Sequence, residues 1–273
     1  MKISNYLITN LFNSNKLNLL IPDKLLKIII KKQNIYFIKS ELNEFPAINY
    51  PFNFSLKDLE NNLINFKKNP FKTPFNEFPN LALLLKFLFK ENESFSLFDF
   101  GAQYIDNYLF LQNINSNINY FYHDQEGNNL LVEEFIKNKN LKNITVVDKI
   151  DNINQLTFDF VYFGSVIQYL KNYEEILEKI LSKKPKYVFF SGTNFYFNYG
   201  EEKLISKQFN VFPQINYCYF FKFNYFKNLF NSKGYSLDYV AENLYGNLIN
   251  YKHMNKKIND NCKYLDVLFK LNE

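Results

Sequence analysis

Two short apolar runs, each ending in a polar turn, constrain this fold more than any other feature of the sequence. The first leads into Asp99-Phe100-Gly101-Ala102, and the second is Tyr120-Phe121-Tyr122-His123-Asp124. In an open α/β sheet, a glycine after the first strand lets the backbone approach a ligand, and an acidic residue after the second accepts hydrogen bonds from ribose hydroxyls. The separation of Gly101 from Asp124 is close to the ~20 residues that such a unit needs. We therefore predict a nucleoside-binding site.

From residue 81 onward, helical and extended patterns alternate. The predicted helices are 81–90, 106–113, 128–137, 174–181 and 223–232, the last ended by Gly234. The predicted strands are 95–100, 119–123, 143–147, 158–163, 187–190, 235–241 and 264–270. This alternation is typical of βαβ units, and near-continuous apolar strands are typical of a parallel sheet covered on both faces. The last two strands could pair antiparallel.

The first 80 residues differ from the rest. All seven glycines lie at or beyond Gly101, whereas six of the eight prolines fall in the first 80 residues. We predict an irregular N-terminal extension over 1–80, with a short helix at 24–32 and no long regular element between Phe45 and Pro79, and a main domain over 81–273. The extension is either a structural cap on the sheet or a lid with a direct role in substrate binding.

Composition argues against several partners. The formal net charge is +5, and every basic residue is a lysine, because the sequence has no arginine. The bidentate guanidinium contacts that read phosphates and guanine edges are therefore missing, and the lysines alternate with acidic residues. We expect no nucleic-acid partner. The high aromatic content leaves a homodimer interface open.

Metal, disulfide and membrane signals are also weak. Cys218 and Cys262 are too few and too far apart for a disulfide framework, and His123 and His253 lack a second ligand at metal-site spacing. The longest apolar stretch, 81–89, contains a lysine. We expect a cytoplasmic protein with no metal and no stable membrane insertion, although lysine-rich aromatic helices leave contact with a membrane surface open.

Several segments resemble one bacterial protein family. Its members have an Asp-Phe-Gly-Gly motif like residues 99–102, a carboxylate and glutamine like Asp124-Gln125, a Ser/Gly-Val-Leu-Gln-Tyr-Leu turn like residues 165–170, a Lys-Pro-x-Tyr-Val segment like residues 184–188 and an aromatic segment like residues 212–221. Over residues 81 to 271, the chain is similar to class I S-adenosylmethionine-dependent methyltransferases associated with surface-polysaccharide gene clusters.

The resemblance implies a seven-stranded, Rossmann-like methyltransferase sheet that is mostly parallel with an antiparallel last strand. It also implies S-adenosylmethionine as cofactor and, as acceptor, a hydroxyl or amine of a saccharide or sugar nucleotide. The implied cofactor-binding residues are Asp99, Phe100, Gly101, Ala102, Asp124, Gln125, Asp148, Gly164 and Ser165. The catalytic residues are unknown, and the candidates around the acceptor are Gln168, Tyr169, Asn194 and Tyr217.

Each candidate also has a structural interpretation. Asp99 could orient the cofactor or cap the next helix, and Asp124 could bind ribose or be a solvated turn residue. The tyrosines could face a sugar ring or a sulfonium, or belong to the core. His123 is more simply structural, and His253 lies in a polar segment, so no general base is named.

One departure from the family leaves a second function open. Members carry further glycines after the first strand, whereas this chain continues with Ala102-Gln103-Tyr104-Ile105. Tyr104 and Ile105 could crowd the cofactor. The alternative is a non-catalytic scaffold that binds a partner enzyme, with a closed cleft around Tyr104. A nicotinamide-dependent enzyme would need a G-x-G-x-x-G turn, which this loop lacks.

Overall fold

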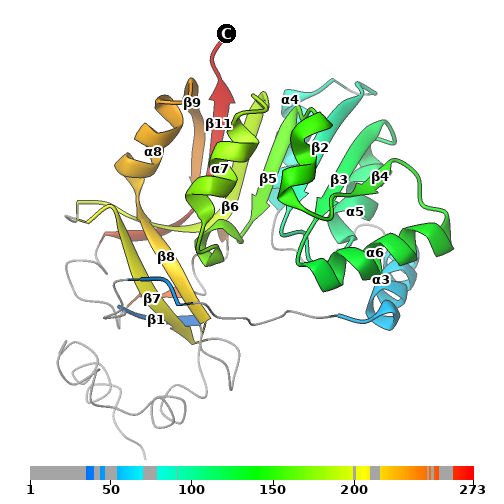
Figure 1. Cartoon of the computed structure of the whole chain (residues 1–273), viewed down its shortest axis with the longest axis horizontal. Helices are drawn as coiled ribbons and strands as arrows, with labels where there is room; N and C mark the ends of the chain where they lie inside the picture. Colours follow the sequence, from blue (N-terminus) through cyan, green and yellow to red (C-terminus); the bar gives the residue numbers. More distant parts are fainter. Residues whose placement is uncertain are drawn as a thin grey trace, which may run out of the picture.

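The computed structural model describes residues 35–39, 44–46, 54–69, 79–90, 92–198, 201–209, 216–244, 246, 249–251 and 261–273. Over these residues, eleven strands form one branched sheet with helices on both of its faces (Figure 1). The predicted helix at 24–32, His253 and the beginning of the aromatic segment, 212–215, lie outside the described residues.

The main part of the sheet consists of β2 (Phe95–Phe100), β3 (Ile118–His123), β4 (Ile144–Val146), β5 (Phe160–Gly164), β6 (Tyr187–Tyr196), β9 (Tyr235–Glu242) and β11 (Cys262–Leu271). Their order is β4-β3-β2-β5-β6-β11-β9. The strands from β4 to β6 pair in parallel, whereas β11 lies antiparallel between β6 and β9. This is the predicted mostly parallel, Rossmann-like methyltransferase fold, and the antiparallel pairing of the last two predicted strands is confirmed.

Alternate residues of the strands pack into two separate cores, one on each face of the sheet. Leu97 faces one core with α4 (Pro79–Leu88), α5 (Asp106–Ile114) and α6 (Glu126–Lys139). Phe98 faces the other with the 3₁₀ helix η1 (Ile150–Gln155), α7 (Tyr173–Leu181) and α8 (Phe223–Asn231). Both side chains are fully buried, which is worth about 2 to 3 kcal/mol each. Helices on both faces leave the strand ends as the place for a site.

A second group of strands branches from the end of β6. It contains β1 (Ile35–Lys39), β7 (Lys203–Phe209), β8 (Asn216–Lys222) and β10 (Ile249–Asn250). The last two residues of β6 pair with β8, and the order continues through β7 and β1 to β10. In Figure 1, β1, β7 and β8 lie together at the lower left, away from β2, β3 and β4. The prediction that the β6 strand ends at Phe190 is wrong, because pairing with β11 and then β8 extends it to Tyr196.

The prediction of no long regular element between Phe45 and Pro79 is also wrong. The helix α3 (Leu56–Lys68) has thirteen residues and begins with a capping box. Ser55 Oγ accepts a hydrogen bond from the Asp58 amide at 3.3 Å, and the Asp58 carboxylate accepts one from the Ser55 amide at 2.7 Å. These bonds satisfy two donors that a helix start otherwise leaves free, so α3 forms between proline-rich stretches. α3 packs against α5 and α6, and β1 joins the branched sheet. The domain boundary at residue 80 stays a prediction.

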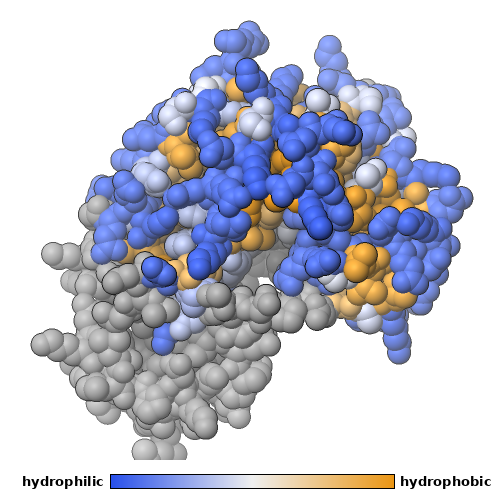
Figure 2. Space-filling model, viewed as in Figure 1, coloured by the Kyte–Doolittle hydropathy of each residue, from blue (hydrophilic) through white to orange (hydrophobic). Residues whose placement is uncertain are grey.

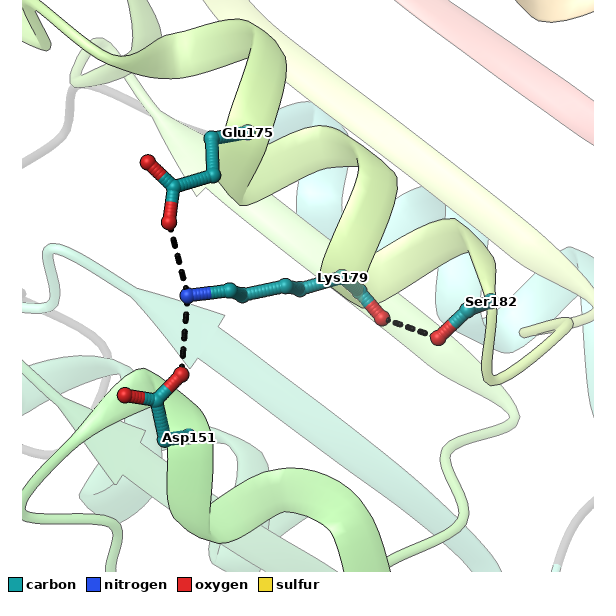
Figure 3. A network of polar contacts seen from close by, with 4 residues as sticks. All are labelled: Asp151, Glu175, Lys179 and Ser182. Carbon is teal, nitrogen blue, oxygen red and sulfur yellow. Dashed lines mark hydrogen bonds and ion pairs between the residues drawn. The ribbon is translucent and has the colours of Figure 1, made fainter.

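The surface over α7 is polar. Lys179 binds Asp151 on η1 and Glu175 one turn earlier, each at 2.8 Å, while Ser182 Oγ donates to the Lys179 carbonyl (Figure 3). Hydrophilic residues cover most of the described surface on the face shown in Figure 2. Within the described part of the chain, no helix is long and apolar enough to cross a membrane.

Candidate functional site

The strand register brings the predicted cofactor residues to one edge of the sheet. Phe100 is the partner of His123 in β3 and of Phe163 in β5. The next residues along the three strands, Gly101, Asp124 and Gly164, therefore lie side by side, and Gly164 is the last residue of β5. Carboxyl ends of parallel strands are where open α/β sheets bind ligands. This edge is the candidate functional site.

The turn after β2 is tight at Gly101, whose φ is +74°. The amides of Gly101 and Ala102 both donate to the His123 carbonyl, at 2.8 and 3.1 Å, which ties the turn to β3. A Cβ atom at position 101 would lie 2.5 Å from Val166 Cγ2, so the turn from β5 packs directly on the glycine. A glycine is required here both by the backbone conformation and by this contact.

The next residues of the turn lean toward α3 and β3. Gln103 also has a left-handed φ, +54°, and its carbonyl accepts a hydrogen bond from the Tyr122 hydroxyl at 2.5 Å. The Tyr104 ring lies 4.9 Å from the Phe54 ring, just before the cap of α3. Ile105 is fully buried in the core beneath the helices. Packing of Tyr104 against Phe54 and of Ile105 in the core thus fixes the course of this loop.

Asp124 lies beside this turn and is partly buried. Asn128 Nδ2 donates to its Oδ2 at 2.8 Å, and the backbone amides of Gln103 and Gln125 also donate to the carboxylate. Burial raises the pKa of Asp124, while these hydrogen bonds lower it. Asn129 holds the main chain of Asp124 through its side-chain amide. Asp124 is therefore a rigidly placed acceptor at the end of β3.

Asp99 is buried below the turn. Its Oδ2 accepts hydrogen bonds from the Tyr120 hydroxyl and, at 2.9 Å, from Asn107 Nδ2 on α5. Burial raises the pKa of Asp99 to about 6, against the lowering by both hydrogen bonds. Asp99 thus links β2 to β3 and to α5, and it supports the Gly101 turn from below. The neighbouring Phe100 ring packs into the core against His123 and Phe163, so Phe100 can meet a ligand only through its main chain.

Two other predicted residues lie at the rim. Asp148 is exposed, and its Oδ1 accepts hydrogen bonds from the Lys149 amide and Asn152 Nδ2. These bonds lower the pKa of Asp148. Gln125 is exposed and precedes the first turn of α6.

His123 is fixed inside the structure. Its Nδ1 lies 2.6 Å from the Val147 carbonyl, which can only accept, so Nδ1 carries the proton in this contact. The ring packs beside Phe98 and Phe100. Burial lowers the pKa of His123. The imidazole joins β3 to the segment after β4, as its structural interpretation predicts.

The turn after β5 brings two acceptor-side candidates together. Ser165 has a left-handed φ of +54°, and its Oγ accepts a hydrogen bond from Gln168 Nε2 at 3.1 Å. Gln168 belongs to the 3₁₀ helix η2 (Ile167–Tyr169) and is 1% exposed. The Gln168 Oε1 atom accepts a hydrogen bond from the backbone amide of Asn194 in β6 at 3.1 Å. Ser165, Gln168 and Asn194 thus form one hydrogen-bonded group.

The other two acceptor-side candidates lie against the second group of strands. The Tyr169 hydroxyl donates to Gln208 Oε1 of β7 at 2.7 Å. Tyr217 is half-buried in β8, opposite Lys207. The Tyr169 side chain therefore bridges η2 to β7, whereas Tyr217 lies on β8, the strand between β6 and β7.

A separate hollow of about 390 Å³ lies at the opposite edge of the sheet. Polar residues at the amino ends of β2, β3 and β5 line it, among them Ser96 and Asp159. The Asp159 carboxylate already accepts the amide and hydroxyl of Ser96, both at 2.8 Å. Because loops at the carboxyl ends carry the sites of such sheets, the hollow does not compete with the candidate site.

Sequence reasoning missed several polar residues near the candidate functional site, at the carboxyl edge of the sheet. Asp106, the first residue of α5, is 6% exposed, and burial raises its pKa to about 6. Its position directly after the glycine turn was the signal that could have found it. No such signal marks Tyr251 or the β11 residues Tyr264 and Asp266, because strand pairing between segments far apart in the sequence brings them to the site.

No protein-family model and no curated protein matches this sequence. Solved structures similar to it include a S-adenosylmethionine-dependent methyltransferase from Clostridium acetobutylicum, at 11% identity and a TM-score of 0.46 over 78% of this chain and 98% of the other. The 1,6-didemethyltoxoflavin-N1-methyltransferase of Burkholderia thailandensis has 10% identity and a TM-score of 0.49 over 87% and 95%. Coclaurine N-methyltransferase has 13% identity and a TM-score of 0.49 over 96% and 97%. The strand order described above carries the fold assignment on its own.

Proposed function

We propose that this chain is an S-adenosylmethionine-dependent methyltransferase that acts on a hydroxyl or amine of a saccharide or sugar nucleotide in surface-glycan biosynthesis. The observation that carries the proposal is the pairing of the Gly101 turn with Asp124 at the carboxyl edge of this sheet. The acceptor class rests on the family resemblance of the sequence. The two free thiols, Cys218 and Cys262, suit the reducing environment of the cytosol, where we place the enzyme.

The residues at the edge fit the cofactor's chemistry. Ribose hydroxyls are donors, and the Asp124 carboxylate is an acceptor held at the end of β3. The Gly101-Ala102 turn presents main chain without a bulky side chain at its first position. We assign contacts with the cofactor to Gln125, Gly164 and the main chain of Phe100 and Ser165, and contacts with the adenine edge to Asp148. Asp99 orients the turn.

When bound, S-adenosylmethionine supplies a methyl group whose bond to sulfur breaks as the acceptor's lone pair bonds to carbon, and the acceptor's proton passes to solvent. The protein's part is to align the acceptor, which is a large source of rate in such transfers. We assign this alignment to Gln168, Tyr169, Asn194 and Tyr217. Within the described residues His123 is the one imidazole, and its Nδ1 is held by Val147, so the proposal assigns it no role as general base.

A non-catalytic scaffold is the second candidate, and two observations favour it. Val166 packs on Gly101, and the Asp124 carboxylate already accepts hydrogen bonds from within the chain. A protein that had lost its cofactor would need no accessible acceptor at this edge. The two candidates differ in whether the folded chain binds the cofactor.

Calorimetry with S-adenosylmethionine and S-adenosylhomocysteine tests the proposal. We expect micromolar binding by the wild-type chain and a loss of at least about a hundredfold in Asp124→Ala, because two hydrogen bonds to a charged acceptor are worth about 3 kcal/mol or more. Asp151→Ala, which removes an exposed carboxylate over α7, is the matched control and should bind like the wild type. Absence of binding by the folded wild-type chain would contradict the enzyme and favour the scaffold.

A further inference from the structure

The pairing of β6 with β11 contains a β-bulge. The register shifts between Leu265 and Val267, so Ser191 and Gly192 together lie opposite Asp266. Gly192 adopts a left-handed φ of +62°, a conformation typical of glycine in bulges. Bulges often re-aim side chains beside active sites, and this one interrupts the strand that carries Asn194.

Asp266 holds the bulge in place. Its Oδ1 accepts hydrogen bonds from Ser191 Oγ at 2.9 Å, from the Gly192 amide at 2.9 Å and from Asn243 Nδ2 at 2.7 Å. Asp266 is fully buried, and a buried carboxylate is tolerated only with such partners. The bulge is therefore a built feature of the sheet.

The bulge decides which way Asn194 faces. Phe190 and Phe195 both belong to the core under α7 and α8, although five positions separate them and a regular strand would turn them to opposite faces. The extra residue of the bulge shifts the alternation of side chains by one position. Phe195 therefore faces the same core as Phe190, and Asn194 faces the opposite side of the sheet. There it lies opposite Tyr264 of β11.

On that face, Asn194 joins a hydrogen-bonded group of neutral side chains, through its main chain on one side and its side chain on the other. The Tyr264 hydroxyl lies 2.8 Å from Ser165 Oγ, which also accepts a hydrogen bond from Gln168 Nε2, and Gln168 Oε1 accepts one from the backbone amide of Asn194. At the far end, the Tyr251 hydroxyl donates to Asn194 Oδ1 at 2.9 Å. We call these five residues the neutral cluster. Burial raises the pKa of Tyr251 well above its usual value, so its hydroxyl stays protonated.

One donor in the neutral cluster is unused. Asn194 is 1% exposed, and its Nδ2 has no hydrogen-bond partner among the residues that the structure describes. A buried amide left without a partner costs about 1 to 3 kcal/mol, and such groups call for an explanation such as a ligand. The other end of the same amide is fixed by Tyr251, so Nδ2 is held in one orientation.

We propose that the neutral cluster is the acceptor subsite and that Asn194 Nδ2 donates to an uncharged oxygen of the acceptor, a sugar hydroxyl or an amide carbonyl. This inference rests on the proposed methyltransferase function. All five side chains are uncharged, so within the described part of the chain they offer no counter-charge to a phosphate or carboxylate that loses its hydration there. The subsite therefore binds the neutral part of the acceptor, and Asp266 is a positioning residue that acts through the bulge.

Saturation-transfer NMR on the complex with S-adenosylhomocysteine tests this proposal. The probes are N-acetylglucosamine, which is neutral, and its 1-phosphate, which is anionic. We expect the wild-type complex to bind the neutral sugar, and Asn194→Leu, which removes the amide at similar size, to weaken that binding by about tenfold. Tyr251→Phe, a milder change that frees Asn194, should weaken it by a smaller factor.

Thr193→Val is the matched control. Thr193 is the neighbouring residue, is also fully buried and also has a hydroxyl without a partner among the described residues, but it lies on the opposite face. We expect its sugar binding to stay within about twofold of wild type. Thermal unfolding and S-adenosylhomocysteine affinity, measured for every variant, show whether each is folded and loaded.

Three results would overturn the subsite. They are a loaded wild-type chain that does not bind the neutral sugar, binding of the 1-phosphate alone, and unchanged binding of the neutral sugar in both Asn194→Leu and Tyr251→Phe. A wild-type chain that does not bind S-adenosylhomocysteine would instead contradict the proposed function itself, so the two failures are distinguishable.

Discussion

The polar groups that the ends of β2 and β3 contribute include two carboxylates, whereas the side chains of the neutral cluster are two amides, two phenols and one hydroxyl. Asp99 and Asp124 have pKa values raised by burial, and each is held by donors from neighbouring segments. The neutral cluster at Asn194 has its own hydrogen-bond chain and contains no charged group. One edge of the sheet thus presents two chemically different surfaces.

Both surfaces nevertheless use the same backbone device. In each, a glycine with positive φ lies under a large side chain from a neighbouring segment: Val166 over Gly101 and Tyr264 over Gly192. A Cβ atom at either glycine would lie 2.5 Å from that neighbour. The groups that hold the two glycines differ, because the Gly101 amide donates to the His123 carbonyl and the Gly192 amide donates to the Asp266 carboxylate. The two turns can therefore be tested separately.

Replacing Gly101 should have the largest effect on stability. A left-handed alanine costs about 1 to 2 kcal/mol and overpacking against Val166 about 1 to 3 kcal/mol, so Gly101→Ala should lower the free energy of unfolding by up to about 5 kcal/mol. Denaturant unfolding measures this, and S-adenosylhomocysteine affinity should fall as well.

Gly127→Ala is the matched control for Gly101→Ala. Gly127 lies in the helix α6, and a Cβ there meets nothing within 4 Å. Its replacement should raise the free energy of unfolding by about 0.5 to 1 kcal/mol, because alanine is the better helix former. A Gly101→Ala variant as stable as wild type would show that the turn is not packed as described.

Asp266→Asn should have the next largest effect. The amide leaves a neutral oxygen in place of the charged Oδ1 that three donors share, which weakens each hydrogen bond by about 1 kcal/mol and should lower the free energy of unfolding by roughly 3 kcal/mol. Asp238→Asn, at an exposed position on β9, should change it by less than about 0.5 kcal/mol. Equal stability of the two variants would mean that Asp266 does not hold the bulge.

Asp99 should give a smaller effect that depends on pH. Its pKa is raised from 3.8 to about 6 in the folded chain, so the folded state binds this proton more tightly than the unfolded state. The stability that Asp99 contributes is therefore full below its unfolded pKa and is lost as pH rises through about 6, by at most about 3 kcal/mol. Asp99→Asn should flatten the decline in stability between pH 4 and pH 7.

The control for Asp99 is Asp151→Asn, which changes an exposed carboxylate on η1. Its stability should follow the pH dependence of the wild type. If the stability of Asp99→Asn declines with pH as it does in the wild type and in Asp151→Asn, burial of Asp99 does not determine the pH dependence of stability. The charge difference between the two groups of side chains would then have no measurable effect.

Local patterns predicted the main sheet well. The strand at 95–100 has the bounds of β2, and the helix at 106–113 differs from α5 by one residue, because apolar runs and periodicity are local properties. α3 was missed although Ser55 and Asp58 stand three residues apart, since the prolines on both sides outweighed that signal. β1 and β7 depend on pairing across more than 150 positions, which no local window contains.

The site shows the same division. Gly101 and Asp124 could be proposed from their places after two apolar runs, and the register of β2 with β3 brings them together. The bulge could not be found, because Ser191 and its partner Asp266 are 75 positions apart. Without the bulge, strand alternation would have turned Asn194 toward the core under α7 and α8.

A crystal structure of the chain with S-adenosylhomocysteine tests the central claim most directly. The account predicts the ligand across the carboxyl ends of β2 and β3, with its ribose hydroxyls within hydrogen-bond distance of Asp124 and its sulfur facing the neutral cluster. A ligand bound elsewhere, or crystals grown at saturating ligand in which Asp124 keeps only its internal donors, would contradict it.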